Sequence, residues 1–172
     1  MQDNGSIRLV RCAEGMNKTK TISLSQGQVA LVDDADFEWL SQWKWCADHQ
    51  HNSVYAIRAG SYRKIIYMHR LIMDAKPGQM IDHRNNNGLD NQRGNLRHCT
   101  NMQNARNSIK KKKGSSRFKG VCWKKSNRNW TAQIRLRYKS FHIGSFASEI
   151  DAARAYDVKA KELFGEFAKT NF

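Results

Sequence analysis

The most informative stretch of the chain, residues 68–108, reads MHRLIMDAKPGQMIDHRNNNGLDNQRGNLRHCTNMQNARNS. It holds the adjacent pair Asp82 and His83, then Asn95 twelve residues later, then Asn104 nine residues beyond that. An imidazole titrates near neutral pH and can act as a base without special tuning. Carboxylate and amide oxygens are hard ligands that suit Mg²⁺ or Mn²⁺ better than zinc. A base beside a hard cation favours hydrolysis of a phosphodiester.

The first part of this constellation is predicted on a strand that ends. Residues 79–82 are a short strand candidate, and residues 84–94 form a polar loop rich in Asn and Gly, which tolerate turns. Neighbouring strand residues point to opposite faces, so Asp82 and His83 can share one site only if the strand ends or bends there. Asn95 can both donate and accept hydrogen bonds, and we expect it to pin the loop beside His83.

The second part is predicted on a helix. Thr100 at the N-cap and Gln103 three residues later match a capping box, which predicts a helix through about residue 109. That helix would carry Asn104 in its first turns. Asn101 and Asn107 are close by and remain rivals of Asn104 as a cation ligand.

This segment resembles the ββα-metal core of HNH endonucleases, especially the phage and intron-encoded homing type. The resemblance covers about residues 67–108 and rests on MHRLI, IDHRNNNGLDNQRGNLRHCT and NMQNARN. It implies that His83 activates water, that Asn95 holds the loop, and that Asp82 and Asn104 bind one Mg²⁺ or Mn²⁺ per active site. The third letter of the motif is Asn here, a weaker ligand than an imidazole.

Some basic residues of the same stretch keep two interpretations. His69 fits either a phosphate contact or a packed core histidine, with packing slightly favoured. Four arginines fit either DNA phosphate contacts or solvated surface charges; they are Arg70, Arg84, Arg93 and Arg97.

Charge along the chain indicates a polyanionic partner. The 172 residues carry 30 Lys and Arg against 15 Asp and Glu, a net charge of +15. The net charge is −2 over residues 1–57, +6 over residues 58–109 and +7 over residues 114–172. The polyanion is therefore expected to meet the chain from about residue 58 onward.

Cysteine spacing and hydropathy argue against other classes of protein. The four cysteines lie far apart with no C-x-x-C pair, which gives no support to a zinc knuckle. No secretory apolar segment precedes them, so we expect reduced thiols and a cytoplasmic protein that works on the host cell's DNA. No apolar run approaches the ~18 residues of a membrane span, and nucleic acid is favoured over a membrane as the partner.

The predicted fold class is α+β, in four segments. Residues 1–57 are a β-rich N-terminal segment, residues 58–109 the nuclease core, residues 110–116 a basic linker and residues 117–172 a second unit. In the first segment, residues 19–32 alternate polar and apolar side chains around Gly27, which predicts two strands and a turn. Asp33 and the acidic residues after it predict the start of a short helix over FEWLSQWKW.

The linker contains four consecutive lysines, Lys110, Lys111, Lys112 and Lys113, before Gly-Ser-Ser. Adjacent lysines repel one another, and Gly and Ser add freedom. In a DNA enzyme the linker is expected to track the phosphate backbone and to steepen the salt dependence of binding. A soluble hinge or a nuclear-import tag is the alternative.

Residues 117–172 predict three strands and one helix. FKGVCWKK, NWTAQIRLR and KSFHIGSF alternate with a period of two residues and are separated by turn-sized breaks. SEIDAARAYDVKAKELF has helical spacing, with Ser148 as N-cap and Gly165 as the C-terminal stop. One parity of the middle strand would face the helix: Trp130, Ala132, Ile134 and Leu136. The other would face outward: Thr131, Gln133, Arg135 and Arg137.

This second unit resembles the plant ethylene-response-factor (APETALA-type) DNA-binding domain, from FKGV through NWTAQI and IGSF to DAARAYD and Asn171. The resemblance implies that the sheet lies in the major groove of DNA, which admits a β surface. It implies a DNA-binding role for Lys119, Lys124, Arg128, Gln133, Arg135, Arg137 and His142. Cys122 and His142 stand where the plant domains usually have Arg and Trp, so the plant target sequence is not expected to transfer. A unit that serves only as a spacer is the alternative.

Together these expectations describe a monomeric, sequence-targeted endonuclease that binds double-stranded DNA and nicks one strand. One alternative is a DNA-binding regulator with a decayed nuclease core, against which the intact set of four site residues argues. Another is an RNA-binding or RNA-cleaving protein, against which the resemblance of the second unit argues.

Overall fold

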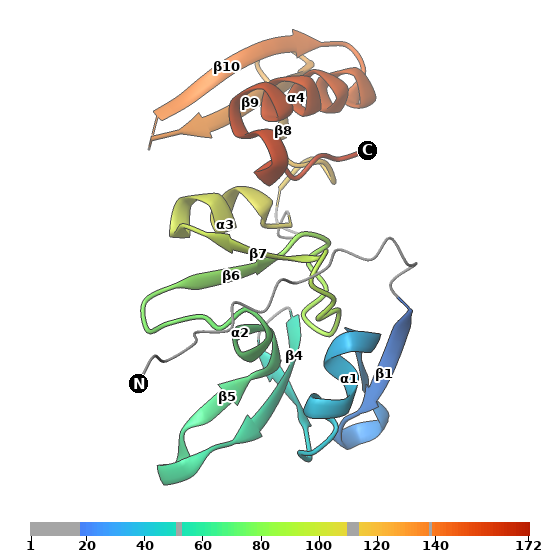
Figure 1. Cartoon of the computed structure of the whole chain (residues 1–172). Coiled ribbons are helices and arrows are strands. Elements are labelled where there is room, and N and C mark those ends of the chain that lie inside the picture. Colours follow the sequence, from blue (N-terminus) through green and yellow to red (C-terminus); the bar gives the residue numbers. More distant parts are fainter. Residues whose placement is uncertain (1–17, 51–52, 110–113, 138) are drawn as a thin grey trace, which may run out of the picture.

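The computed structural model describes residues 18–50, 53–109, 114–137 and 139–172, and it mixes helices and strands as the α+β prediction requires. The elements are β1 (Thr19–Ser23), β2 (Val29–Asp33), α1 (Asp34–Leu40), β3 (Cys46–Gln50), β4 (Ser53–Ala59), β5 (Ile65–Tyr67), α2 (Met68–Ile72), β6 (Met80–His83), β7 (Leu96–Cys99), α3 (Asn101–Asn107), β8 (Val121–Lys124), β9 (Asn129–Leu136), β10 (Lys139–Phe146) and α4 (Glu149–Phe164), with short 3-10 turns at η1 (Ser25–Gly27), η2 (Ser61–Arg63) and η3 (Gly165–Phe167). Three groups of elements lie one above another in Figure 1: the N-terminal elements through α2 at the bottom, β6, β7 and α3 in the middle, and the C-terminal sheet with α4 at the top.

The N-terminal hairpin forms where the alternating pattern predicts it. β1 and β2 pair antiparallel, and the turn between them places both Gln26 and Gly27 at positive φ. α1 starts directly after β2, but Asp33 at its N-cap position does not cap the helix. The Asp33 carboxylate instead accepts a hydrogen bond from the Arg93 backbone N–H at 2.9 Å, and Asp36 accepts two from the Arg93 guanidinium at 2.7 Å each. The acidic run therefore anchors the loop that follows β6.

One hydrophobic core joins the N-terminal elements to the strands of the predicted nuclease segment. Leu40, Val32 and Met68 are fully buried in it, and Ile81 of β6 and Leu96 of β7 belong to the same cluster. β3, β4 and β5 form a three-stranded antiparallel sheet beside this core. β4 continues through residue 57, the predicted end of the N-terminal segment. The N-terminal segment thus supports the site from below in Figure 1.

β6, β7 and α3 form a compact ββα unit. β6 pairs antiparallel with β7, which places Asp82 opposite Arg97 and His83 opposite Leu96. α3 begins directly after β7 with the predicted capping box: Thr100 Oγ1 accepts from the Gln103 N–H, and the Gln103 side chain accepts from the Thr100 N–H. The helix ends at Asn107, two residues earlier than expected.

The C-terminal unit has the predicted sheet and helix. Its strands lie in the order β10-β9-β8, all antiparallel, and α4 packs on one face through small residues such as Ala152 and Ala153. Ser148 accepts the N-cap hydrogen bond, and Gly165 ends α4 with a positive φ of 53°. One residue of the predicted outer parity differs, because Thr131 is buried between the flanking strands at Cys122 and Ser145.

The C-terminal unit contacts the ββα unit at the end of α3, through the side chains of Arg106 and Lys119. The Arg106 guanidinium at the end of α3 lies over the Phe164 ring, 4.6 Å from its centroid. Lys119 donates from its ammonium to the carbonyl oxygens of Arg106 at 2.5 Å and Ser108 at 2.8 Å. These contacts orient α3 relative to α4 and η3.

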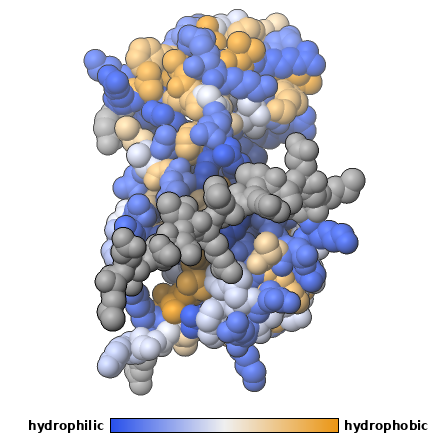
Figure 2. Space-filling model, viewed as in Figure 1, coloured by the Kyte–Doolittle hydropathy of each residue, from blue (hydrophilic) through white to orange (hydrophobic). Residues whose placement is uncertain are grey.

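The face of the protein that Figure 2 shows is mainly polar. In Figure 2, hydrophobic residues gather over the C-terminal unit at the top, and hydrophilic residues dominate most of the remaining coloured surface. No helix within the described ranges is both long and apolar enough to cross a membrane.

Candidate active site

A cleft of about 410 Å³ lies where β6 ends beside α3. Asp82 and His83 line it from β6, Asn104 from α3 and Tyr55 from β4. β6 ends at His83, and the chain turns there, with the Asn86 N–H donating to the His83 carbonyl at 2.9 Å. The end of the strand explains how two adjacent residues reach one cleft.

His83 is buried within a group of rings. Its side chain is 6% exposed, and its ring centroid lies 5.0 Å from that of His69 and 5.9 Å from that of Tyr55. Burial lowers the pKa of His83, and this effect is opposed by the Asn91 side chain and by the carboxylates of Asp82 and Asp90. A lowered pKa keeps the imidazole neutral near pH 7, which is the form that can accept a proton.

His69 is a packed histidine rather than a surface phosphate contact. It is buried on α2, between the rings of Tyr55, Tyr67 and His83. Burial, with the charges of His83 and Arg70, lowers the pKa of His69 to about 3. The structure therefore agrees with the interpretation of His69 as a packed core histidine. Its imidazole packs against that of His83.

Asn91 is a neighbour of His83 that sequence reasoning missed. Its side chain is fully buried, and neither its Nδ2 nor its Oδ1 has a hydrogen-bond partner of normal geometry among the described residues. The buried Nε2 of His83 and Nδ1 of His69 also lack such a partner there. Asn91 is nevertheless the neighbour whose side chain raises the pKa of His83, against the effect of burial. In an Asn-rich loop nothing in the sequence separates this residue from a turn former.

Asn95 ties the loop that follows His83. Its Oδ1 accepts from the Asn85 N–H at 3.0 Å, and its Nδ2 donates to the Asp90 carbonyl at 2.7 Å. Its own carbonyl accepts from the Arg84 N–H at 2.9 Å. These three bonds fix both ends of the loop next to His83.

The Asp82 carboxylate contacts two side chains, those of Arg97 and Asn107. Its Oδ2 accepts from Arg97 Nε at 2.9 Å and Nη2 at 2.7 Å, and both side chains are 6% exposed. Asn107 Nδ2 lies 3.0 Å from each Asp82 oxygen and 2.9 Å from the His83 carbonyl. Asn104, the predicted second cation ligand, lines the same cleft as its rival Asn101; both residues are exposed, and Asn104 Nδ2 lies 3.3 Å from Met80 Sδ. Asn107 lies three residues after Asn104, and of the two amides it is the one that contacts Asp82.

The donor set of the cleft fits a hard cation that is shared with substrate. Within the described ranges, no group of three or more His, Cys, Asp or Glu side chains gathers around a metal position. Mg²⁺ in phosphate-processing sites is often held by one or two carboxylates, substrate phosphates and water rather than by a closed protein cage. Asp82 Oδ1, with the amide oxygen of Asn104, would be the pair of ligands in such an arrangement, because Oδ1 contacts only the Asn107 amide whereas Oδ2 also accepts two hydrogen bonds from Arg97.

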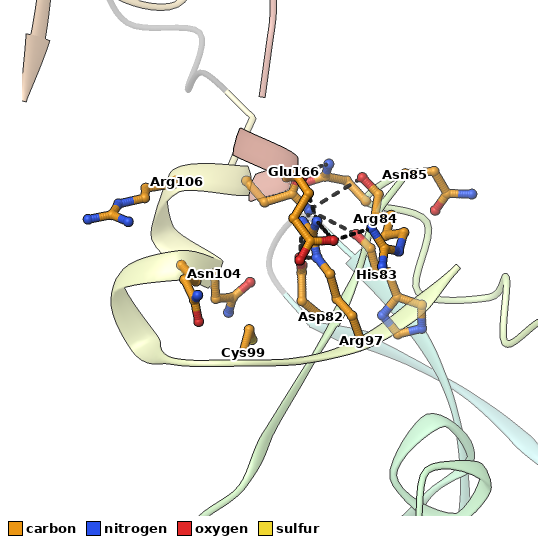
Figure 3. A network of polar contacts seen from close by, with 12 residues as sticks. Asp82, His83, Arg84, Asn85, Arg97, Cys99, Asn104, Arg106 and Glu166 are labelled. Carbon is orange, nitrogen blue, oxygen red and sulfur yellow. Dashed lines mark hydrogen bonds and ion pairs between the residues drawn. The ribbon is translucent and has the colours of Figure 1, made fainter. Parts of the chain in front are cut away.

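A turn of the C-terminal unit extends this polar network. Arg97 Nη1 donates to the Glu166 carbonyl at 2.5 Å, and the Arg97 guanidinium lies over the Phe167 ring, 3.8 Å from its centroid. The Glu166 carboxylate is 2.6 Å from Arg84 Nη1 and 3.7 Å from Arg97 Nη1. Figure 3 shows Glu166 beside Arg84, Arg97 and Asp82. Sequence reasoning missed these contacts because the partners are 82 and 69 residues apart.

The predicted DNA-binding residues of the C-terminal sheet are mostly exposed. Gln133 pairs with His142 across β9 and β10, and partners that lie opposite each other point to the same face. Arg135 is two residues from Gln133 on β9, so it shares that face, which we name the outer face. The exposed set is Lys124, Arg128, Gln133, Arg135, Arg137 and His142. Arg128 and Arg137 lie in turns at positive φ, 47° each.

Lys119 is half-buried and differs from this exposed set. Lys119 was expected to contact DNA, but its ammonium donates to carbonyls at the end of α3, and burial together with the nearby Lys169 lowers the pKa of Lys119 to about 8. The structure therefore gives Lys119 a role in joining the two units. The four lysines at residues 110–113 lie outside the described residues.

Comparison with known proteins identifies two kinds of relatives. The AP2 domain model matches residues 116–166. An uncharacterized HNH endonuclease of Acanthamoeba polyphaga mimivirus is 33% identical over 148 residues, which are 85% of this chain and 76% of that protein. An AP2/ERF and B3 domain-containing protein of Oryza sativa subsp. japonica is 48% identical over 58 residues, 34% of this chain and 16% of that protein. An APETALA2-like protein of Oryza sativa subsp. indica is 44% identical over 62 residues, 35% of this chain and 14% of that protein.

The two kinds of relatives match different extents of the chain. The viral relative matches 85% of it, whereas the plant relatives match about a third of it. The chain spans less than a fifth of the length of these plant proteins.

Proposed function

The chain belongs to the HNH endonuclease family and carries an AP2 domain, and from this premise we propose that it is a sequence-targeted, homing-type DNA endonuclease. It hydrolyses one phosphodiester with a histidine base and one divalent metal, and it nicks one strand of double-stranded DNA. It works as a monomer in the cytoplasm of its host cell. The observation that carries this proposal is that the buried His83 lies beside Asp82 at one cleft.

His83 is proposed to take the proton from the attacking water. The support is its lowered pKa, which keeps the imidazole in the accepting form at neutral pH. Asn95 holds the adjoining loop through Asn85 and Asp90, and this limits how far the imidazole can turn. Asn95 is therefore a positioning residue, and His83 is the residue that meets the reacting atoms.

Asp82 and Asn104 are proposed to hold one Mg²⁺ or Mn²⁺, which when bound neutralises the phosphate and the leaving oxygen. Asp82 supplies the carboxylate, and Asn104 is the proposed amide ligand; its rival Asn101 is also exposed and lines the same cleft. Asn107 is assigned a different task, because the two N–H donors of its amide face the Asp82 carboxylate and the His83 carbonyl. It orients the carboxylate from α3.

The outer face of the C-terminal sheet is proposed to read the duplex. Gln133, Arg135 and His142 share this face, and amide and guanidinium groups form bidentate hydrogen bonds with base edges in the major groove. Exposed turn residues such as Arg128 and Arg137 are proposed to contact phosphates, which position the protein without reading sequence. The Lys110–Lys113 run is proposed to add affinity that falls with salt.

A second candidate function is a DNA-binding regulator with an inactive core. The observation that favours it is the Arg97–Asp82 pair, because a guanidinium on the only carboxylate among these proposed site residues weakens its attraction for a cation. Such a protein would bind duplex DNA and cleave nothing.

A plasmid assay separates the two functions. Supercoiled plasmid is incubated with the full chain in Mg²⁺, in Mn²⁺ and in EDTA, and open-circular and linear products are quantified. The endonuclease proposal predicts open circles with either metal and none in EDTA. Binding without any metal-dependent nick supports the regulator. Linear product at low enzyme, with no open-circular intermediate, would contradict single-strand nicking, and preferential cleavage of an RNA competitor would contradict the DNA assignment.

A further inference from the structure

The Glu166 carboxylate lies close to two arginines that neighbour Asp82 and His83. It is 2.6 Å from Arg84 Nη1 and 3.7 Å from Arg97 Nη1. Arg84 directly follows His83, and Arg97 bonds Asp82, so both cations border the residues assigned to chemistry. Figure 3 shows the carboxylate reaching this group from the C-terminal turn η3.

The Glu166 carboxylate does not hold η3 in place; other groups of the turn do. The backbone carbonyl of Glu166 accepts from Arg97, and the Phe167 ring packs under the same guanidinium. The side chains of Glu166 and Arg84 are 56% and 44% exposed, and ion pairs this exposed contribute little to stability. The carboxylate can therefore leave the two arginines while the turn stays docked.

A phosphate suits this place, because Arg84 offers an exposed guanidinium and the buried Arg97 guanidinium, which is bonded to Asp82 and to the Glu166 carbonyl, adds a second positive charge. Guanidinium groups bind carboxylates and phosphates through the same fork of N–H donors. The pair stands next to the proposed base and on the side of Asp82 that faces the C-terminal unit. The Glu166 carboxylate occupies the position that an anionic ligand would take, and its negative charge repels an incoming phosphate.

We propose that Arg84 and Arg97 form a phosphate-binding subsite for the DNA backbone beside His83, and that Glu166 occupies it in the free protein. A backbone phosphate displaces the carboxylate when the duplex enters. The choice of DNA as the source of the phosphate rests on the proposed function. The subsite involves both units, because its arginines belong to the ββα unit and Glu166, which occupies it, belongs to the C-terminal unit.

Glu162 supplies a matched control for Glu166. Both are glutamates near the end of α4, their side chains are 58% and 56% exposed, and each forms an ion pair, Glu162 with Lys159 at 2.8 Å. Replacement of either by Gln raises the net charge by the same amount. Only Glu166→Gln opens the proposed subsite.

The test is equilibrium binding of a mixed-sequence DNA duplex to the full chain in EDTA, by fluorescence anisotropy at fixed salt. Glu166→Gln is expected to tighten binding about threefold relative to Glu162→Gln, the scale of one exposed charge interaction. Arg84→Gln in the Glu166→Gln background is expected to remove that gain. Thermal melts of each variant check that the fold is kept.

Equal binding by the two Gln variants, weaker binding by Glu166→Gln, or a gain that survives Arg84→Gln would overturn the proposal. Because the assay contains no metal, it does not depend on cleavage. A gain that requires Arg84 in a protein that never nicks plasmid would keep the subsite and remove the nuclease assignment.

Discussion

The Arg97 guanidinium and the Asp82 carboxylate form a buried ion pair with two hydrogen bonds, 2.9 and 2.7 Å long, at the centre of the candidate site. The Arg97 guanidinium also contacts the C-terminal turn η3 through the Glu166 carbonyl and the Phe167 ring. One side chain thus links the proposed cation-binding carboxylate to the DNA-binding unit.

Removal of Arg97 is expected to destabilise the protein strongly. Arg97→Met leaves the Asp82 carboxylate buried without its cation, a change that typically costs about 3–5 kcal/mol of unfolding free energy. Urea denaturation of the variant measures this loss. Arg97→Met combined with Asp82→Asn should recover part of it, and a single variant within about 1 kcal/mol of the parent would show that the pair is not buried as described.

Stability is expected to fall as the pH drops below about 6.5. The folded pKa of His69 is about 3, below its unfolded value of 6.5, so the unfolded chain binds more protons between these pH values. Stability is therefore retained above pH 6.5 and lost progressively toward pH 3, by on the order of a few kcal/mol from this group. His69→Gln should flatten the pH profile of the melting temperature, whereas the exposed His98→Gln should not. Equal slopes in both variants would count against this assignment.

Cleavage is expected to persist to a pH below 6.5. Burial lowers the pKa of His83, so the acidic limb of the kcat/KM profile should lie below the ordinary imidazole value. The Asn91 side chain raises the pKa of His83, so Asn91→Ala should move that limb to still lower pH. Steady-state nicking rates from pH 4.5 to 8 measure both. A limb that moves upward in Asn91→Ala would rule out the described effect of Asn91.

Asn107 is expected to contribute to stability, and Asn104 to cation binding. Asn107→Ala removes the amide that bonds the buried Asp82 and should cost about 1–3 kcal/mol of unfolding free energy. Asn104→Ala removes an exposed side chain and should stay within about 0.5 kcal/mol of the parent. The same Asn104→Ala protein should need a higher Mg²⁺ concentration for half-maximal nicking. An unchanged Mg²⁺ requirement would show that Asn104 is not the amide ligand of the cation.

Local patterns predicted the elements that surround the site. The capping box at Thr100 starts α3, Ser148 and Gly165 bound α4, and alternation predicted β1, β2 and the C-terminal sheet. Each depends on residues a few positions apart, where side-chain chemistry and backbone geometry are tied directly. Asp82 and His83 reach one cleft for the same kind of reason, the end of a strand.

Contacts between distant residues could not be predicted in this way. Glu166 reaches Arg84 only because η3 docks on the ββα unit, and nothing in the local sequence of either residue reports that docking. The choice between Asn104 and Asn107 depends on how far along β6 the helix α3 crosses, which no spacing rule fixes. Asn91 is buried by tertiary packing alone.

The central claim is that His83 is the base of a DNA endonuclease, and one paired measurement tests it most directly. His83→Ala and His98→Ala each remove one imidazole, from a buried cleft position and from an exposed position on the paired strand. Plasmid nicking in Mg²⁺ and duplex binding in EDTA are measured for both. The account predicts that His83→Ala loses nicking by at least about 100-fold with binding unchanged, while His98→Ala keeps both. Nicking that survives His83→Ala at the parent rate would contradict it.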